Sequence, residues 1–178
     1  GASLYSVTDG RLKVGSFHGN CELVYISSEG KGLPVFRKAL SIKKGLVEAT
    51  LYTSGLGVYE AYLNGERVGK KAQNGLTVYD ELKPGFTETR KRRFYNSYDV
   101  TEMLVENKTN VLTAVVSHGW WSDGSVSQYY EEDAFISKLI LKYSDGTSEV
   151  IDTDETWKAE MASPVVDADI FSGETYDA

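Results

Sequence analysis

The stretch LGVYEAYLNGERVG, residues 56–69, decides the fold of this chain. Residues 58–63 are rich in aromatic and apolar side chains and predict a strand. Asn64-Gly65 follows directly, and both residues tolerate the positive φ that the tightest hairpin turns require. Arg67-Val68 then begins a returning strand. The stretch therefore predicts a β-hairpin within a protein of antiparallel strands.

Strand patterns continue on both sides of this hairpin. Upstream, Leu46–Thr53 alternates and places its apolar side chains on one face. Downstream, Asn110–Ser117 carries apolar side chains on both faces, which is typical of a central strand. Phe135–Tyr143 and Thr147–Asp152 flank the tight turn Ser144-Asp145-Gly146 and predict a second hairpin.

The rest of the chain is dominated by turn signals. Residues 70–89 are predicted to be irregular, residues 93–100 a strand, and residues 99–104 one helical turn capped by Asp99 or Thr101. Another short strand begins at Trp157. About eight to ten short strands without a long helix predict an all-β chain, an antiparallel sandwich or jelly roll. We expect one domain over residues 1–178, with its core at about 34–160 and an irregular acidic tail at 161–178.

Composition excludes several classes of function. The 178 residues include 12 Tyr and carry a formal charge of −7, which argues against a nucleic-acid partner because phosphates require a basic surface. Neutral ligands such as sugars need no such surface. Cys21 is the single cysteine, so no disulfide forms within the chain. No apolar stretch approaches the about 20 residues that span a bilayer, so no membrane partner is expected.

No catalytic motif marks this sequence. It lacks the nucleophile elbow, the phosphate-binding loops and the paired-histidine zinc motif, and its two histidines lie 100 positions apart. Its clustered acids read as solvated side chains rather than as the carboxyl pair of a glycosidase. A calcium site is possible in one irregular loop, which supplies Asp123, Gly124, Glu132 and Asp133. No catalytic residue is predicted.

The loop from residue 118 to about residue 133 contains the most unusual stretch. Two adjacent tryptophans follow an apolar strand, and flanking glycines allow sharp turns. Aromatic faces stack on sugar rings while carboxylates and amides bind hydroxyls. Large aromatics also plug the end of a sandwich, or pack on another domain. The candidates for carbohydrate binding or interdomain packing are His118, Trp120, Trp121, Asp123, Gln128, Tyr129 and Tyr130.

Four segments in order resemble one enzyme family. The hairpin at residues 56–69, Pro84-Gly85-Phe86-Thr87, Tyr98-Asp99-Val100-Thr101 and Ser117-His118-Gly119-Trp120-Trp121 are similar to the N-terminal domains of bacterial α-L-rhamnosidases, glycoside hydrolase family 78. Residues 169–178, DIFSGETYDA, resemble the segment that leads out of that domain. The resemblance extends from about Pro34 to the last residue. Phe86 departs from the family, which usually has Trp there, and residues 70–82 form a longer loop.

The resemblance implies a galactose-binding-like jelly roll and a role as an accessory domain. Catalysis is then expected in a separate (α/α)6 domain of the same parent chain, following this domain, so that the parent is an α-L-rhamnosidase while this segment is not itself an enzyme. Two alternatives remain open. One is an autonomous module that binds rhamnose-containing glycans, with calcium as its possible cofactor. The other is the sugar-binding domain of a β-galactosidase-like enzyme. A periplasmic or secreted location in a bacterium is favoured over a cytoplasmic one.

Overall fold

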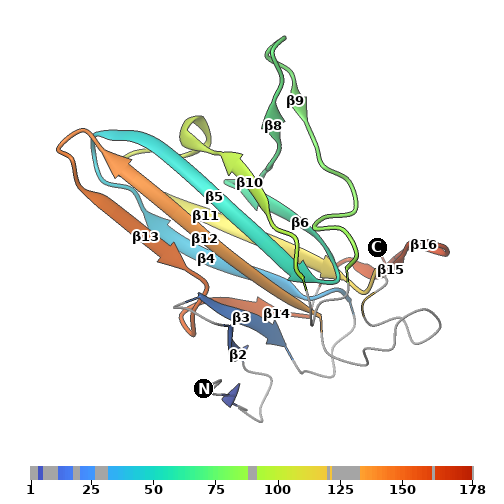
Figure 1. Ribbon diagram of the computed structural model, residues 1–178. Coiled ribbons are helices and arrows are strands. Elements are labelled where there is room, and N and C mark those ends of the chain that lie inside the picture. The colour runs from blue at the N-terminus through green and yellow to red at the C-terminus, as the bar shows by residue number, and fades with distance from the viewer. Residues whose placement is uncertain are drawn as a thin grey trace.

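Two antiparallel sheets pack face to face in a computed structural model of the protein (Figure 1). The structure describes residues 32–87, 92–119, 121, 133–161 and 163–177, together with the backbone of three earlier strands. Among these residues, no helix is long and apolar enough to cross a bilayer. The architecture confirms the all-β sandwich that the strand patterns predict.

The first sheet has the strand order β1-β2-β3-β12-β5-β10, and β13 also pairs with β12. Its strands are β1 (Leu4–Tyr5), β2 (Leu12–Phe17), β3 (Cys21–Ile26), β5 (Leu46–Leu56), β10 (Asn96–Asp99), β12 (Ala134–Tyr143) and β13 (Ser148–Asp152). The second sheet has the order β14-β4-β11-β6-β7. Its strands are β4 (Val35–Ser41), β6 (Val58–Leu63), β7 (Glu66–Arg67), β11 (Thr109–Ser117) and β14 (Lys158–Glu160).

Successive long strands alternate between the two sheets, so the chain repeatedly crosses the end of the sandwich. The crossing from β5 to β6 takes place at a single residue, Gly57, whose φ is +116°. A Cβ atom at this position would lie 2.4 Å from the carbonyl oxygen of Ser117, so only glycine fits the turn. This crossing forms one end of the sandwich, where the candidate site lies.

The core fills the space between the sheets. On β11, Leu112, Ala114 and Val116 are buried, and the strand pairs with β4 on one side and β6 on the other. The prediction of a central strand is therefore confirmed. Phe135 on β12 is fully buried at the centre, and its ring contacts those of Phe36, Tyr59 and Trp157 at centroid distances of 6.5, 5.4 and 6.0 Å.

The predicted Asn-Gly hairpin is confirmed in detail. Asn64 and Gly65 have φ values of +54° and +84°. The Asn64 side chain accepts from the Val111 N–H at 2.9 Å and donates to Asn110 Oδ1 at 2.8 Å. Asn110 is fully buried and also binds the backbone of Val105. The turn residue thus helps to hold β6 against β11 as well as reversing the chain.

The predicted helical turn is a 3₁₀ helix, η1 (Thr101–Met103), and Asp99 Oδ1 accepts from the Thr101 N–H at 3.0 Å. Two segments expected to be irregular contain hairpins instead. Residues 70–89 include β8 (Lys70–Lys71) and β9 (Thr77–Val78), which project from the sandwich (Figure 1). The tail at 161–178 contains β15 (Val165–Asp169) and β16 (Gly173–Tyr176).

Both unexpected hairpins depend on local turn chemistry, which a search for alternating apolar residues does not detect. The Asn74-Gly75 turn closes β8–β9, with only two residue pairs in the ladder. In the tail, the Asp169 carboxylate accepts from the N–H groups of Phe171 and Ser172, both at 2.7 Å. Side-chain-capped turns of this kind bring short strands together without alternating hydrophobicity.

Candidate functional site

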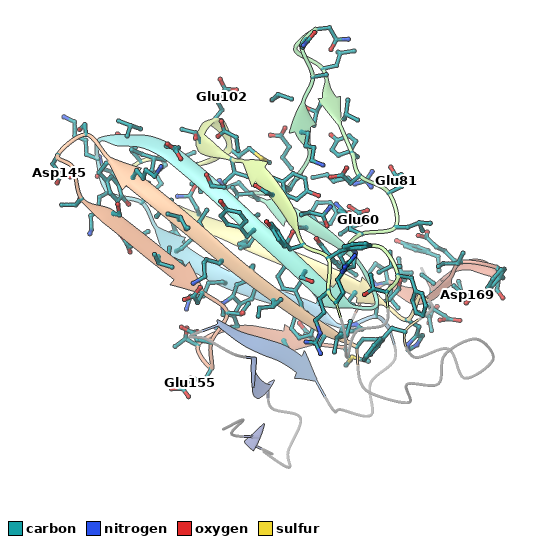
Figure 2. The ribbon with its side chains drawn as sticks, in the orientation of Figure 1. Glu60, Glu81, Glu102, Asp145, Glu155 and Asp169 are labelled. Carbon is teal, nitrogen blue, oxygen red and sulfur yellow. The ribbon has the colours of Figure 1, made fainter. Side chains whose placement is uncertain are left out.

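A pocket of about 230 Å³ lies at the end of the sandwich where β5 crosses to β6. Its walls come from the crossing itself, from residues 81–87, from the loop after β11, and from the turn between β15 and β16. Figure 2 marks Glu60 and Glu81 beside this end and Asp169 on the β15–β16 hairpin. The lining residues are Gly55, Leu56, Gly57, Val58, Glu81, Leu82, Gly85, Phe86, Thr87, Trp121 and Ile170.

One wall of the pocket belongs to a strap, residues 79–87, that runs beside the edges of both sheets. The Tyr59 N–H on β6 donates to the Lys83 carbonyl at 3.0 Å. From the other sheet, the Tyr98 hydroxyl on β10 donates to Asp80 Oδ2 at 3.0 Å. The strap therefore closes the edge between the sheets and carries Glu81, Leu82 and Phe86 to the pocket.

The Lys83 side chain anchors the strap and is fully buried. Its ammonium lies 2.9 Å from Glu60 Oε2, and 5.7 and 5.8 Å from the ring centroids of Tyr59 and Tyr98. A buried charge requires a partner of opposite sign, and aromatic faces add further attraction. Burial raises the pKa of both tyrosines, so their phenols stay protonated.

The same carboxylate also holds Arg67, on β7. The Arg67 guanidinium forms two hydrogen bonds of 2.6 Å with Glu60 and one of 3.2 Å with Glu81 of the strap. This bidentate geometry is the strongest form of such a pair. Glu60 thus joins the strap to the hairpin whose sequence predicted the fold.

Trp121 forms the floor of the pocket and is 4% exposed. It packs on Leu56, Ala134 and Ile136, which lie on the outer side of the first sheet. This small cluster is separate from the main core. Trp121 therefore covers the end of one sheet instead of filling the space between the two.

The two ends of the predicted binding loop meet. His118 Nδ1 lies 2.8 Å from Asp133 Oδ2; the His118 side chain is 50% exposed and that of Asp133 is 6% exposed. Of the predicted loop candidates, only His118 and Trp121 lie within the described residues. Trp120, Asp123, Gln128, Tyr129 and Tyr130 lie outside them.

The calcium prediction has little support in the part of the chain that the structure describes. No group of three or more His, Cys, Asp or Glu side chains gathers there in a way that could hold a metal ion. Asp133 is engaged by His118, and the other proposed ligands, Asp123, Gly124 and Glu132, lie outside the described residues. The described groups therefore do not fit a calcium ion.

The chemistry of the pocket favours an apolar occupant. Six of its lining side chains are apolar, whereas Glu81 and Thr87 are the two polar ones. Both of these already have partners, since Glu81 accepts from Arg67 and the Thr87 hydroxyl donates to the Arg92 carbonyl at 2.7 Å. Sugar sites need several polar groups aimed at hydroxyls. The pocket is better suited to an apolar side chain from another domain.

Sequence reasoning missed Leu82, Phe86 and Ile170 as site residues. Leu82 and Phe86 are each 48% exposed at the rim. A signal was nevertheless present, because four of the segments that resemble the rhamnosidase domains supply lining residues: residues 56–69, 84–87, 117–121 and 169–178. Segments far apart in the chain therefore converge on one end of the sandwich.

Comparisons with known proteins agree with this resemblance. The family model of the α-L-rhamnosidase N-terminal domain matches residues 44–178. An α-L-rhamnosidase of Streptomyces avermitilis is 44% identical over 140 residues, covering 76% of this chain and 12% of that protein. The crystal structure of a Streptomyces avermitilis α-L-rhamnosidase complexed with L-rhamnose has a TM-score of 0.71 at 38% identity, covering 83% of this chain and 14% of that one.

A more distant structure shows the same fold. The α-L-rhamnosidase from Aspergillus terreus has a TM-score of 0.72 at 28% identity, and the match covers 89% of this chain and 18% of that one. This chain therefore spans less than a fifth of the length of each of these relatives.

Loss of Glu60 and loss of Lys83 are expected to destabilise the fold to different extents. Glu60→Gln removes the negative charge that lies 2.9 Å from a buried ammonium, and we expect it to lower the free energy of unfolding by about 3 kcal/mol. Lys83→Met keeps the apolar stem and leaves Glu60 bound to Arg67, so the loss should be clearly smaller. Urea unfolding of both variants measures the difference. A larger loss of stability for Lys83→Met than for Glu60→Gln would contradict the view that an unpaired buried ammonium is the main cost.

The strap also predicts a dependence of stability on pH. Hydrogen bonds from Lys70 and, to a smaller extent, Tyr98 lower the pKa of Asp80 below its ordinary value. A carboxyl with a lowered pKa stabilises the fold above its unfolded pKa of about 3.9, and this contribution is lost as the pH falls through the folded value.

Asp80→Asn and Lys70→Gln should therefore both flatten the fall in unfolding free energy on acidification from about pH 5 to pH 2. Urea titrations at a series of pH values measure the slope. An unchanged slope in both variants would contradict a role for this pair in acid stability.

Proposed function

This chain belongs to the family of α-L-rhamnosidase N-terminal domains, and from that membership we propose that it is an accessory, non-catalytic domain of a glycoside hydrolase of the α-L-rhamnosidase type. Its role is to pack against the catalytic domain of the same polypeptide. The pocket end, with Leu82, Phe86 and Ile170 around Trp121, is the packing face. The bond-breaking groups belong to the catalytic domain, expected to be an (α/α)6 barrel.

One observation carries this proposal: the segments that resemble the family meet at an apolar pocket. Residues that serve only the core would be expected between the sheets, whereas these lie at an exposed end. Half-exposed apolar side chains around a pocket are typical of a surface that another domain covers. Phe171, beside Ile170, extends this surface and is 71% exposed.

The other candidate functions have weaker support. An autonomous rhamnose-binding module was expected to use Trp120 or Trp121; Trp121 is buried, and Trp120 lies outside the described residues. Its calcium requirement has no fitting cluster among the described residues. Family membership favours the rhamnosidase domain over the sugar-binding domain of a β-galactosidase-like enzyme. Rhamnose-containing glycans remain a proposed partner of the parent protein.

The packing role is tested with Leu82→Asn in the parent enzyme. Asn tolerates the positive φ of +51° at this position, so the backbone is undisturbed. We expect the half-life of rhamnosidase activity at raised temperature to shorten several-fold. The reason is that burying the Leu82 side chain at the interface contributes about 2 kcal/mol of stability, which the variant loses. In the 178-residue chain alone, the same change should leave unfolding nearly unaltered, since Leu82 is half exposed there.

Val47→Asn is the matched control. Val47 is 57% exposed and lies near the start of β5, at the opposite end of the sandwich. Equal effects of the two variants on the parent would count against a specific packing face. So would a parent lacking this domain whose activity and thermal half-life match those of the intact enzyme.

A further inference from the structure

A pair of tyrosines lies on the outer face of the first sheet, outside the pocket end. Tyr52 on β5 points outward, because its neighbours Leu51 and Thr53 are buried toward the core. Tyr95, just before β10, is 69% exposed. The two ring centroids are 6.0 Å apart with the planes inclined at 56°. Around this pair, Thr50, Ser54 and Ser97 supply polar side chains to the outer face, so the two rings stand out from their immediate neighbours.

The register extends this pair into a row that crosses the sheet. Tyr52 is directly opposite Lys138 on β12, which in turn is opposite Asp152 on β13. Lys138 Nζ and Asp152 Oδ1 are 2.8 Å apart. With neighbouring strands about 4.8 Å apart, the row from Tyr95 to Asp152 is roughly 14 Å long. Figure 1 shows β10, β5, β12 and β13 side by side in the layer nearer the viewer.

The charges of the row are balanced in pairs, while Asp99 on β10, on the same face, has its carboxylate held by Thr101. Lys138 is paired with Asp152, and Lys142 is paired with Glu48 at 2.8 Å. The described groups of the row thus present donors and acceptors without a net charge, although the whole protein carries −7. The row therefore offers an anion no net positive charge, and we take its ligand to be neutral and polar.

Aromatic and hydrogen-bonding groups in one row suit a carbohydrate. The tyrosine rings offer rigid faces for the C–H surface of a sugar ring at little cost in side-chain entropy. Their hydroxyls, Ser97 opposite Tyr52 and the Lys138–Asp152 pair can exchange hydrogen bonds with sugar hydroxyls. The face is open and its row is longer than one sugar ring, so it matches a chain better than a single sugar.

We propose that the row Tyr95–Tyr52–Lys138–Asp152 binds a neutral polysaccharide chain along the outer face of the first sheet. This site is separate from the packing face, since the pocket has none of these residues in its lining. It gives the domain a second role, which is to hold the protein on a polymeric glycan.

The test is native electrophoresis of the protein through gels that contain galactomannan, xyloglucan or arabinan, with polygalacturonate as an acidic comparison. We expect at least one neutral polymer to retard the protein and polygalacturonate not to. Tyr95→Ala should weaken the retarding interaction about fivefold, the size expected for loss of one aromatic stacking contact. Tyr95→Phe should retain most of it, because the ring face is kept.

Tyr176→Ala provides a matched control, since Tyr176 is 65% exposed on β16 and lies outside the row. It should migrate like the unmodified protein. Absence of retardation by all three neutral polymers overturns the proposal, as does retardation by polygalacturonate alone or equal retardation of the Tyr95→Ala and Tyr176→Ala variants. Leu82→Asn should bind polysaccharide normally, so a failure of the packing role and a failure of this site are distinguishable.

Discussion

An ammonium group buried at the edge of a sandwich needs a negative partner, and Lys83 finds it in Glu60, 2.9 Å away. The position of this charge determines much else at the pocket end. The strap must follow β6 so that Lys83 can reach the carboxylate, and the Tyr59 N–H then meets the Lys83 carbonyl. Once the strap is fixed, Leu82 and Phe86 can only lie at the end of the sandwich. The pocket is therefore a consequence of an ion pair outside its own lining.

The strand framework was predictable because alternation and turn chemistry are local. The central strand at 109–117, the Asn64-Gly65 turn and the hairpin of β12 and β13 all follow from spacing within a few residues. The strap was not predictable in this way. Lysine is almost never fully buried, so a lysine among turn residues predicts an exposed loop. Its partner, Glu60, lies 23 positions away, and no local pattern connects the two.

The candidate site was predicted in part, for a related reason. Of the tryptophan pair that the sequence singled out, Trp121 lines the pocket and is buried. The residues that share the pocket with it come from segments 56–58, 81–87 and 170, which are remote in sequence. The resemblance to known domains covers residues 56–58, 84–87 and 170, but neither it nor any local pattern indicated Glu81 and Leu82. Physical patterning predicted the sandwich, and the segments of family resemblance meet at one of its ends.

The outer face of the first sheet shows where a local rule and the observed residue disagree. Strand alternation predicts a polar side chain at position 52, as at the outward positions Thr50 and Ser54 on either side. Tyr52 does not fit that pattern, and Tyr95 meets it from a segment 43 positions later. Exposed aromatic surface gives no advantage to an isolated sandwich, and local violations of this kind are expected where function imposes them. At the pocket end, most of the described lining side chains are apolar, whereas this face combines aromatics with paired charges. The two partners that we propose therefore differ in chemistry: a protein domain at the end and a hydrated neutral polymer on the face.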